Sequence, residues 1–190
     1  MAKPNIAFIE TSLDDGSFEA KLANTAIKAI GDRAEVIPID YADLPMLNAG
    51  TDEPDPAAAL AIRDKLDAAD GVWVFVSEYH KTIPDSVRNL FQWVSMPDTK
   101  NPETGENVLH NMPACITGVG GSKGMVPRAL LGDLLEANGM YVFPIEVGLS
   151  VPEEAFQTND WVMNEADEGA ITMQANDFLN FIQENPIDRK

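Results

Sequence analysis

The stretch Val72-Trp73-Val74-Phe75-Val76 is a run of five consecutive apolar residues, all of them β-branched or aromatic. A strand with one face in water alternates apolar and polar residues, whereas a strand covered by helices on both faces is apolar throughout. We therefore interpret residues 72–76 as the central strand of a parallel sheet that lies between two layers of helices.

Four further short apolar runs lie before and after this strand in the sequence. They occupy residues 6–9, 36–39, 114–119 and 140–147. The segments between the runs have apolar residues at helical spacing. Strands that alternate with helices are typical of a parallel α/β sheet, so we expect five strands and five helices.

The expected helices have recognisable starts and core-facing residues. Pro56, which follows a capping Asp55, and then Pro84 and Pro127 mark three of the starts. The residues expected to face the core are Phe18, Leu22, Ala26 and Ile30, before a helix-ending Gly31; Val87, Leu90, Phe91 and Val94; Leu131, Leu134 and Leu135; and Ile171, Ala175, Phe178, Leu179 and Ile182. We expect one domain over residues 1–190.

Proline positions indicate the order of the strands. Proline cannot donate a ladder hydrogen bond and is confined to strand ends, bulges and edge strands. Pro38 and Pro144 interrupt the second and fifth runs, whereas the other three runs have no interior proline. The order 2-1-3-4-5 places both prolines at sheet edges. We therefore predict an α/β, three-layer flavodoxin-like fold with a five-stranded parallel sheet in this order.

The charge of the chain excludes several classes of partner. Its 190 residues include 31 acidic and 13 basic side chains, a formal net charge of −18. Nucleic acids and anionic membranes bind through Lys and Arg, so we expect neither as a partner. The first residues have the pattern of neither a signal peptide nor a membrane span. The single cysteine, Cys115, is expected to be buried, in a protein of the reducing cytoplasm.

Three loops are expected to meet where ligands bind in such a sheet, beyond the carboxyl ends of the first and third strands. The first has hydroxyls and amides before a helix, which suit a phosphate. The second has an aromatic and several polar residues, and the third has glycines that allow a flat ligand to approach the backbone. The candidate cofactor-binding residues are Thr11, Ser12, Asp14, Gly16, Ser17 and Phe18; Ser77, Glu78, Tyr79, His80 and Lys81; and Gly118, Gly120, Gly121, Ser122 and Gly124.

These loops resemble those of the NAD(P)H-dependent FMN reductase family, which includes quinone, azo-dye and chromate reductases. The residues that carry the resemblance are Ser12 and Gly16-Ser17-Phe18, Glu78-Tyr79 with Ile83-Pro84 and Trp93, and the glycine loop 118–124. The resemblance implies a bound FMN, NAD(P)H as co-substrate, and hydride transfer through the flavin to a quinone-like or other small-molecule electron acceptor. It implies no catalytic side chain, because the flavin carries the chemistry.

Three positions depart from the family pattern. Asp14 stands where the family has an arginine, His80-Lys81 where it has Asn-Gly, and Gln92 where it has an aspartate. A carboxylate at position 14 would repel the FMN phosphate, so we expect weak binding. In the alternative arrangement Asp14 turns to solvent and Lys21 or Lys123 faces the phosphate. Lys81 is expected near the pyrimidine edge of the flavin.

Other functions fit parts of the sequence. A flavodoxin-type electron carrier would share the fold and the acidity, and a paralogue with weak or lost FMN binding would be a binding or regulatory protein. Gly118-x-Gly120-x-x-x-Gly124, followed by Glu146, resembles a dinucleotide fingerprint but follows the fourth strand, not the first. The two histidines lack metal-ligand spacing, and no Gly-x-Ser-x-Gly of a hydrolase is present.

Two segments, residues 95–112 and 148–168, are long for loops of a compact domain. Such loops are usually functional or contact other subunits, and the second contains an isolated Trp161. Trp93 is expected to lie outside the core, where large side chains often mark interfaces. The position of Trp93 and the family resemblance together predict a homodimer or homotetramer formed through the third helix.

Overall fold

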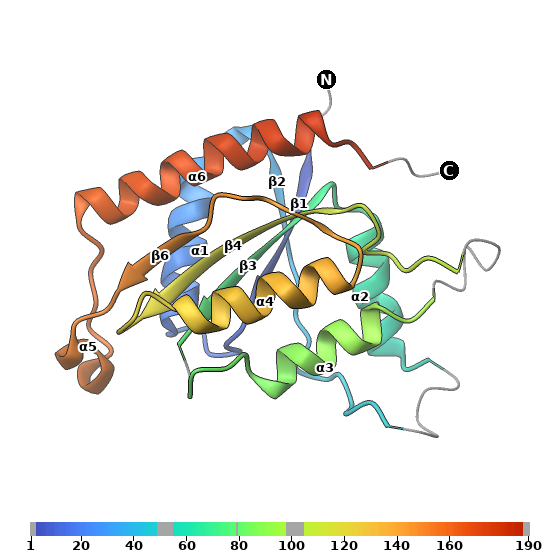
Figure 1. The fold of residues 1–190 in the computed structure, drawn as a ribbon, viewed down its shortest axis with the longest axis horizontal. Coiled ribbons are helices and arrows are strands. Elements are labelled where there is room, and N and C mark those ends of the chain that lie inside the picture. The colour runs from blue at the N-terminus through green and yellow to red at the C-terminus, as the bar shows by residue number, and fades with distance from the viewer. Residues whose placement is uncertain (1–2, 49–54, 79, 98–104, 188–190) are drawn as a thin grey trace.

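A parallel sheet forms the middle layer of the fold (Figure 1). The computed structural model describes residues 3–48, 55–78, 80–97 and 105–187. In these ranges the strands are β1 (Asn5–Glu10), β2 (Glu35–Pro38), β3 (Gly71–Ser77), β4 (Pro113–Gly120), β5 (Tyr141–Val142) and β6 (Val147–Ser150). Their order is β2-β1-β3-β4-β5, and β6 also pairs with β4. The predicted strand order is confirmed.

Helices cover both faces of the sheet (Figure 1). They are α1 (Phe18–Ile30), α2 (Ala57–Asp67), α3 (Asp85–Val94), α4 (Met125–Ala137), α5 (Glu153–Thr158) and α6 (Glu165–Glu184), with a 3-10 helix, η1 (Gly31–Arg33), after α1. On one face α1 and α6 pack around Trp73 and Phe75, and on the other α2, α3 and α4 pack around Val72 and Val74. β3 is buried from residue 71 to residue 76, as predicted for the central strand.

The predicted helix faces point into the core. Of the core-facing residues predicted from the spacing, Phe18 and Leu134 are partly buried and the others are buried. The prediction that Asp55 caps α2 is wrong, because this helix begins after Pro56 and the Asp55 carboxylate pairs with Arg63 Nη1 at 2.5 Å. Arg63 is buried, and a buried charge is costly unless it is paired, so the Asp55 carboxylate contacts the guanidinium and does not cap the helix.

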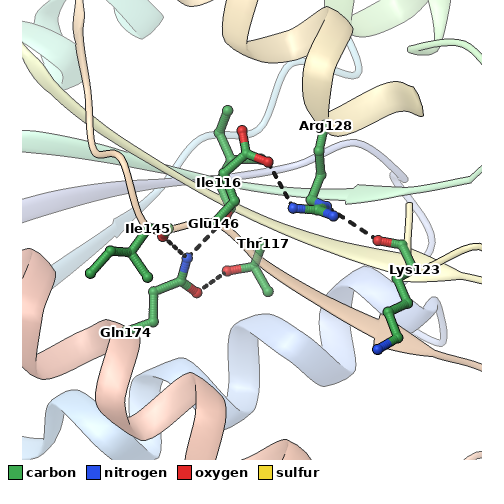
Figure 2. A network of polar contacts seen from close by, with 7 residues as sticks. All are labelled: Ile116, Thr117, Lys123, Arg128, Ile145, Glu146 and Gln174. Carbon is green, nitrogen blue, oxygen red and sulfur yellow. Dashed lines mark hydrogen bonds and ion pairs between the residues drawn. The ribbon is translucent and has the colours of Figure 1, made fainter. Parts of the chain in front are cut away.

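The predicted fifth strand, residues 140–147, is split into β5 and β6. Pro144 lies between them, and because it has no N–H the chain leaves the ladder there. Gln174 of α6 fills the gap with its side chain (Figure 2). Its Nε2 donates to the backbone oxygens of Ile116 and Ile145, both at 2.9 Å.

Gln174 also belongs to a chain of buried polar side chains. Its Oε1 accepts a hydrogen bond from the Thr117 hydroxyl at 2.6 Å, and Thr117 Oγ1 accepts one from Trp73 Nε1 at 2.8 Å. All three side chains are buried. The chain of hydrogen bonds therefore joins β3, β4 and α6 through the interior. Each bond gives a partner to polar atoms that water cannot reach.

Trp93 lies inside the core, so the expectation that it lies outside the core is wrong, whereas an interface through the third helix stays a prediction. The side chain is fully buried, and its Nε1 donates to the backbone oxygen of Pro45 at 2.7 Å. The segment before α2 covers the indole, which the helical spacing of α3 could not show. Trp161 is also buried, in the cluster between α1 and α6, and its segment includes β6 and α5.

Candidate functional site

Three loops begin side by side at the carboxyl ends of β1, β3 and β4. They are the first loop (residues 11–17), the second loop (residues 78–84) and the third loop (residues 121–124). Hydrogen bonds continue the ladders into them: Thr11 N donates to Phe75 O at 2.9 Å, and Glu78 N to Val119 O at 2.8 Å. The structure therefore brings the predicted loops together where the strand order reverses.

The first loop is folded by its own side chains. Ser17 caps α1 by accepting a hydrogen bond from Ala20 N at 3.1 Å. Asp14 Oδ1 accepts from Gly16 N at 3.0 Å, and Ser12 Oγ accepts from Asp14 N at 3.2 Å. The hydroxyls of Ser12 and Ser17 accept these bonds, so their protons remain available to a ligand.

Thr11 and Lys21 interact with other parts of the chain. Thr11 is buried, and its hydroxyl donates to Glu19 Oε1 at 3.1 Å. Lys21 Nζ donates to the backbone oxygens of Asn159 at 2.8 Å and Trp161 at 3.3 Å. Lys21 therefore contacts the segment after α5, and Asp14 is exposed to solvent. The alternative in which Lys123 faces the phosphate stays a prediction.

The first loop is electronegative. Asp14 and Asp15 lie in the loop itself, Glu10 ends β1, and the buried Glu19 lies in the first turn of α1. Burial, and then the charges of Glu19 and Asp15, raise the pKa of Glu10 above its usual value. A carboxyl group whose pKa is raised by neighbouring carboxylates lies in a negative electrostatic potential. The first loop thus lies at a helix N-terminus, as phosphate-binding loops do, but its side chains are negatively charged.

The second loop contacts the third loop and contains two residues with left-handed backbone. β3 ends at Ser77, and Glu78 Oε2 accepts a hydrogen bond from Ser122 N of the third loop at 2.8 Å. His80 and Lys81 both have left-handed backbone, with φ of 49° and 54°. This region favours Asn and Gly, the residues of the family pattern at these two positions. Tyr79 lies outside the described residues.

The glycines at the end of β4 make room for side chains of this same chain. A Cβ on Gly118 would lie 2.5 Å from Arg128 Cδ, and one on Gly120, whose φ is 152°, would lie 2.5 Å from Glu78 Cβ. Among the described residues, and apart from its chain neighbours, no atom lies within 4 Å of a Cβ placed on Gly121. The close approach predicted for a flat ligand is therefore open at Gly121, while side chains of the protein cover Gly118 and Gly120.

No local sequence pattern pointed to Arg128, which lies near the start of α4, after Gly124 at φ 60°. Its Nη1 contacts Glu146 Oε2 at 2.7 Å, and its Nε donates to Lys123 O at 3.2 Å (Figure 2). Glu146 therefore forms an ion pair within the chain, which argues against the ribose-binding role that a dinucleotide fingerprint would give it. The two charged residues are 18 positions apart, so only the fold shows their pairing.

The segment after β6 also reaches the first loop. Asn159 Nδ2 donates to Gly16 O at 2.8 Å, and the Phe18 ring packs edge-on against Phe156 and Trp161, with centroids 5.5 and 5.8 Å apart. Phe18 thus anchors α5 beside the loop. The contact places part of residues 148–168 beside the first loop, and the sequence did not indicate Asn159. A function or a subunit contact for this segment stays a prediction.

The remaining sequence expectations concern a metal, a membrane and the cysteine. Among the described residues, no group of three or more His, Cys, Asp or Glu could hold a metal ion, and His110 pairs with Glu106 at 3.1 Å. None of the described helices combines the length and the apolarity needed to cross a membrane. Cys115 is fully buried as predicted, and burial raises the pKa of its thiol.

Comparison with known proteins gives consistent relatives. Residues 4–152 match the family model of NADPH-dependent FMN reductases. A quinone reductase of Escherichia coli (strain K12) is 32% identical over 102 residues, which are 52% of this chain and 53% of that protein. A 2-hydroxy-1,4-benzoquinone reductase of Burkholderia sp is 26% identical over 125 residues, 66% of this chain and 64% of that protein. The matches thus span about half to two thirds of these curated relatives.

Solved structures share the fold over nearly the whole chain. The flavoenzyme NAD(P)H:(acceptor) oxidoreductase FerB from Paracoccus denitrificans superposes with a TM-score of 0.83 at 21% identity, over 97% of this chain and 100% of that one. A flavodoxin, WrbA-like protein from Agrobacterium tumefaciens gives a TM-score of 0.64 at 12% identity, over 96% and 99%. These similarities confirm the flavodoxin-like fold.

The match to the family of NADPH-dependent FMN reductases indicates FMN as cofactor and NAD(P)H as electron donor. The shape of the three loops fits FMN, because the amino end of α1 and the hydroxyls of Ser12 and Ser17 suit a phosphate and the space beside Gly121 is open. The charge of the first loop does not suit the phosphate, as Asp14 and Asp15 show. On the match to residues 4–152, the chain belongs to the NADPH-dependent FMN reductase family.

Proposed function

We propose that this protein is a flavin-dependent oxidoreductase that transfers hydride from NAD(P)H to a quinone-like or other small acceptor. The observation that carries the proposal is the meeting of the three loops at the carboxyl ends of β1, β3 and β4, in a chain of the FMN reductase family. The quinone reductases among its relatives support the acceptor class.

The loops would divide the binding of the cofactor between them. Ser12 and Ser17 would bind the phosphate end of FMN through their hydroxyl protons, which the bonds they accept leave available. Lys81 and the region beside Gly121 would flank the ring, and the hydrogen bond from Ser122 N to Glu78 keeps the second and third loops at a fixed separation. FMN, when bound, supplies the hydride chemistry, so the side chains bind and orient.

The acidic first loop favours a second candidate function. Asp14 and Asp15 weaken the attraction that α1 would offer a phosphate, as expected of a paralogue with weak or lost FMN binding. Such a protein would be a binding or regulatory protein. The two candidates differ in whether added flavin makes the protein oxidise a nicotinamide.

The test is a titration of the protein with FMN, read by flavin fluorescence, followed by NAD(P)H oxidation with a benzoquinone. Flavin binding with quinone-dependent oxidation supports the proposed reductase. Flavin binding without oxidation supports an electron carrier, and absence of binding supports the paralogue. The same assay, run with NADH and with NADPH, identifies the donor.

We also propose a homodimer or homotetramer in the cytoplasm. Several large apolar side chains are exposed in the single chain, among them Val162 at 83% and Phe156 at 50%, and both lie in the segment beside the first loop. Contiguous patches of exposed apolar side chains often mark interfaces, and Phe156 and Val162 would be part of such a patch. Light scattering over a range of concentrations tests the assembly, and a monomeric mass throughout would contradict it.

A further inference from the structure

The phosphate end of the site carries fixed negative charge. The Asp14 carboxylate is held over the first loop, because its Oδ1 accepts from Gly16 N at 3.0 Å while its backbone oxygen accepts from Ser17 N at 2.9 Å. This carboxylate accepts the hydrogen bond of the Gly16 N–H, which a phosphate oxygen would otherwise accept. Asp15 follows it in the exposed part of the loop.

Among the described residues, no Lys or Arg is paired directly with this charge. Lys21, one turn into α1, donates to the backbone oxygens of Asn159 and Trp161. In the ranges that the structure describes, no Lys or Arg forms an ion pair with Glu10, Asp14, Asp15 or Glu19. The Thr11 hydroxyl is also used within the chain, by Glu19.

The charges can be compared directly. A phosphate monoester carries roughly −1.5 to −2 charges at neutral pH. The amino end of a helix offers about half a positive elementary charge, whereas Asp14 and Asp15 together carry two negative ones. Riboflavin has the same ring and ribityl chain as FMN but no phosphate, so it meets none of this repulsion.

We infer that Asp14 and Asp15 set the flavin specificity of this chain, so that at low ionic strength it binds riboflavin at least as tightly as FMN. The inference rests on the proposed function, because it concerns the same site. It also fixes the sign of the salt effect: the affinity for FMN rises with ionic strength, whereas the affinity for riboflavin changes little. A phosphate site built on arginine would lose FMN affinity under the same change.

The first measurement is a pair of titrations of the wild-type protein, with riboflavin and with FMN, read by flavin fluorescence. Each is made at salt concentrations of about 0.01 M and about 1 M, between which the Debye length falls from about 30 Å to about 3 Å. We expect a riboflavin dissociation constant at or below that of FMN at low salt, and a tighter FMN complex at high salt.

The second measurement uses variants that remove charge and keep the loop fold. In the double variant Asp14→Asn with Asp15→Asn, the side chain at position 14 keeps an oxygen that can accept from Gly16 N. We expect FMN to bind about tenfold more tightly, each tenfold corresponding to about 1.4 kcal/mol, with riboflavin affinity unchanged. The control is Asp32→Asn with Glu35→Gln, which removes the same charge beyond the other end of α1, about 20 Å away by the rise of a helix of 13 residues.

Each outcome decides between the claims. A wild-type protein that binds FMN more tightly than riboflavin at low salt overturns the inference and leaves the proposed function standing. Equal gains in FMN affinity from the loop variant and its control also overturn it, because net charge would then be the cause. Failure to bind either flavin overturns both claims. Since the readout is affinity, a loss of catalytic activity cannot be mistaken for any of these results.

Discussion

The side-chain oxygen of Gln174 lies 2.6 Å from the hydroxyl of Thr117, and the same amide donates to the backbone oxygens of Ile116 in β4 and of Ile145 in the break between β5 and β6. One side chain of the last helix thus completes the hydrogen bonding of the sheet where Pro144 interrupts it. Gln174 is 1% exposed, so water cannot replace these bonds.

Gln174→Leu should lower the free energy of unfolding by about 2–4 kcal/mol, because it leaves several buried polar groups without partners. Urea unfolding followed by circular dichroism measures this loss. The control is Gln183→Leu, the same change at an exposed position of α6, which should alter stability by about 0.5 kcal/mol or less. Equal effects of the two changes would contradict the network.

Gly120→Ala and Gly121→Ala are neighbouring substitutions with opposite expectations. At Gly120 the new methyl group would meet Glu78 Cβ at 2.5 Å on a backbone with φ of 152°, so the loop must shift, at about 1–3 kcal/mol of stability. At Gly121 the space is open, and the change should be within about 0.5 kcal/mol. Thermal unfolding and flavin titration of both variants compare the effects; similar losses would show that the third loop is packed differently.

Lys81 allows the backbone and the charge to be tested separately. Lys81→Gly should raise the free energy of unfolding by about 1 kcal/mol, because φ of 54° costs a residue with a Cβ about that much. Lys81→Met retains the Cβ and should leave stability nearly unchanged.

If the Lys81 ammonium lies near the flavin ring, both Lys81 variants should make the midpoint potential of bound flavin more negative. The expected shift is tens of millivolts, since about 30 mV corresponds to about 1.4 kcal/mol for two electrons. Potentials equal to the wild type in both variants would place the lysine away from the ring.

Glu10 should make stability depend on pH. Its pKa is raised in the folded protein, so its contribution is fully present below the unfolded pKa of 4.5 and is lost as pH rises through the folded pKa. Glu10→Gln removes this loss of stability at higher pH. The melting temperature of the variant should therefore exceed that of the wild type at pH 7 by about 2 °C or less, with a smaller difference at pH 4. The opposite order would show that the Glu10 charge is stabilised.

Cys115 should not react with thiol reagents in the native state. It is fully buried in β4, and burial raises the pKa of its thiol, so both access and thiolate are lacking. Mixing with Ellman's reagent at pH 8 should give no fast reaction, whereas the protein in urea should release one equivalent of chromophore per chain. Fast native labelling would indicate that β4 opens locally.

The strand order and most helices could be predicted from the sequence because their signals are local. The unbroken apolar run of residues 72–76 requires cover on both faces, and prolines 38 and 144 are excluded from the middle of the sheet. The position expected for the site follows from that order alone. These inferences use only periodicity and the missing N–H of proline, and tertiary contacts do not alter either.

The remaining features depend on contacts that are distant in the sequence. Trp93 is covered by a segment almost fifty residues before it, and Asn159 reaches Gly16 across 143 positions. The glycines at 118 and 120 look like ligand-binding glycines, but the fold places Arg128 and Glu78 against them. A glycine in the sequence shows that another group can approach the backbone there, but only the fold shows which group does so.

The split between β5 and β6 has a consequence for solubility at high concentration. An unpaired sheet edge is a template on which another chain can add a strand, which is a common route to aggregation. Here one edge has strands of only two and four residues with Pro144 between them, and the opposite edge, β2, is four residues long and ends at Pro38. Neither edge offers a long continuous row of donors and acceptors, so backbone templating is blocked on both sides of the sheet.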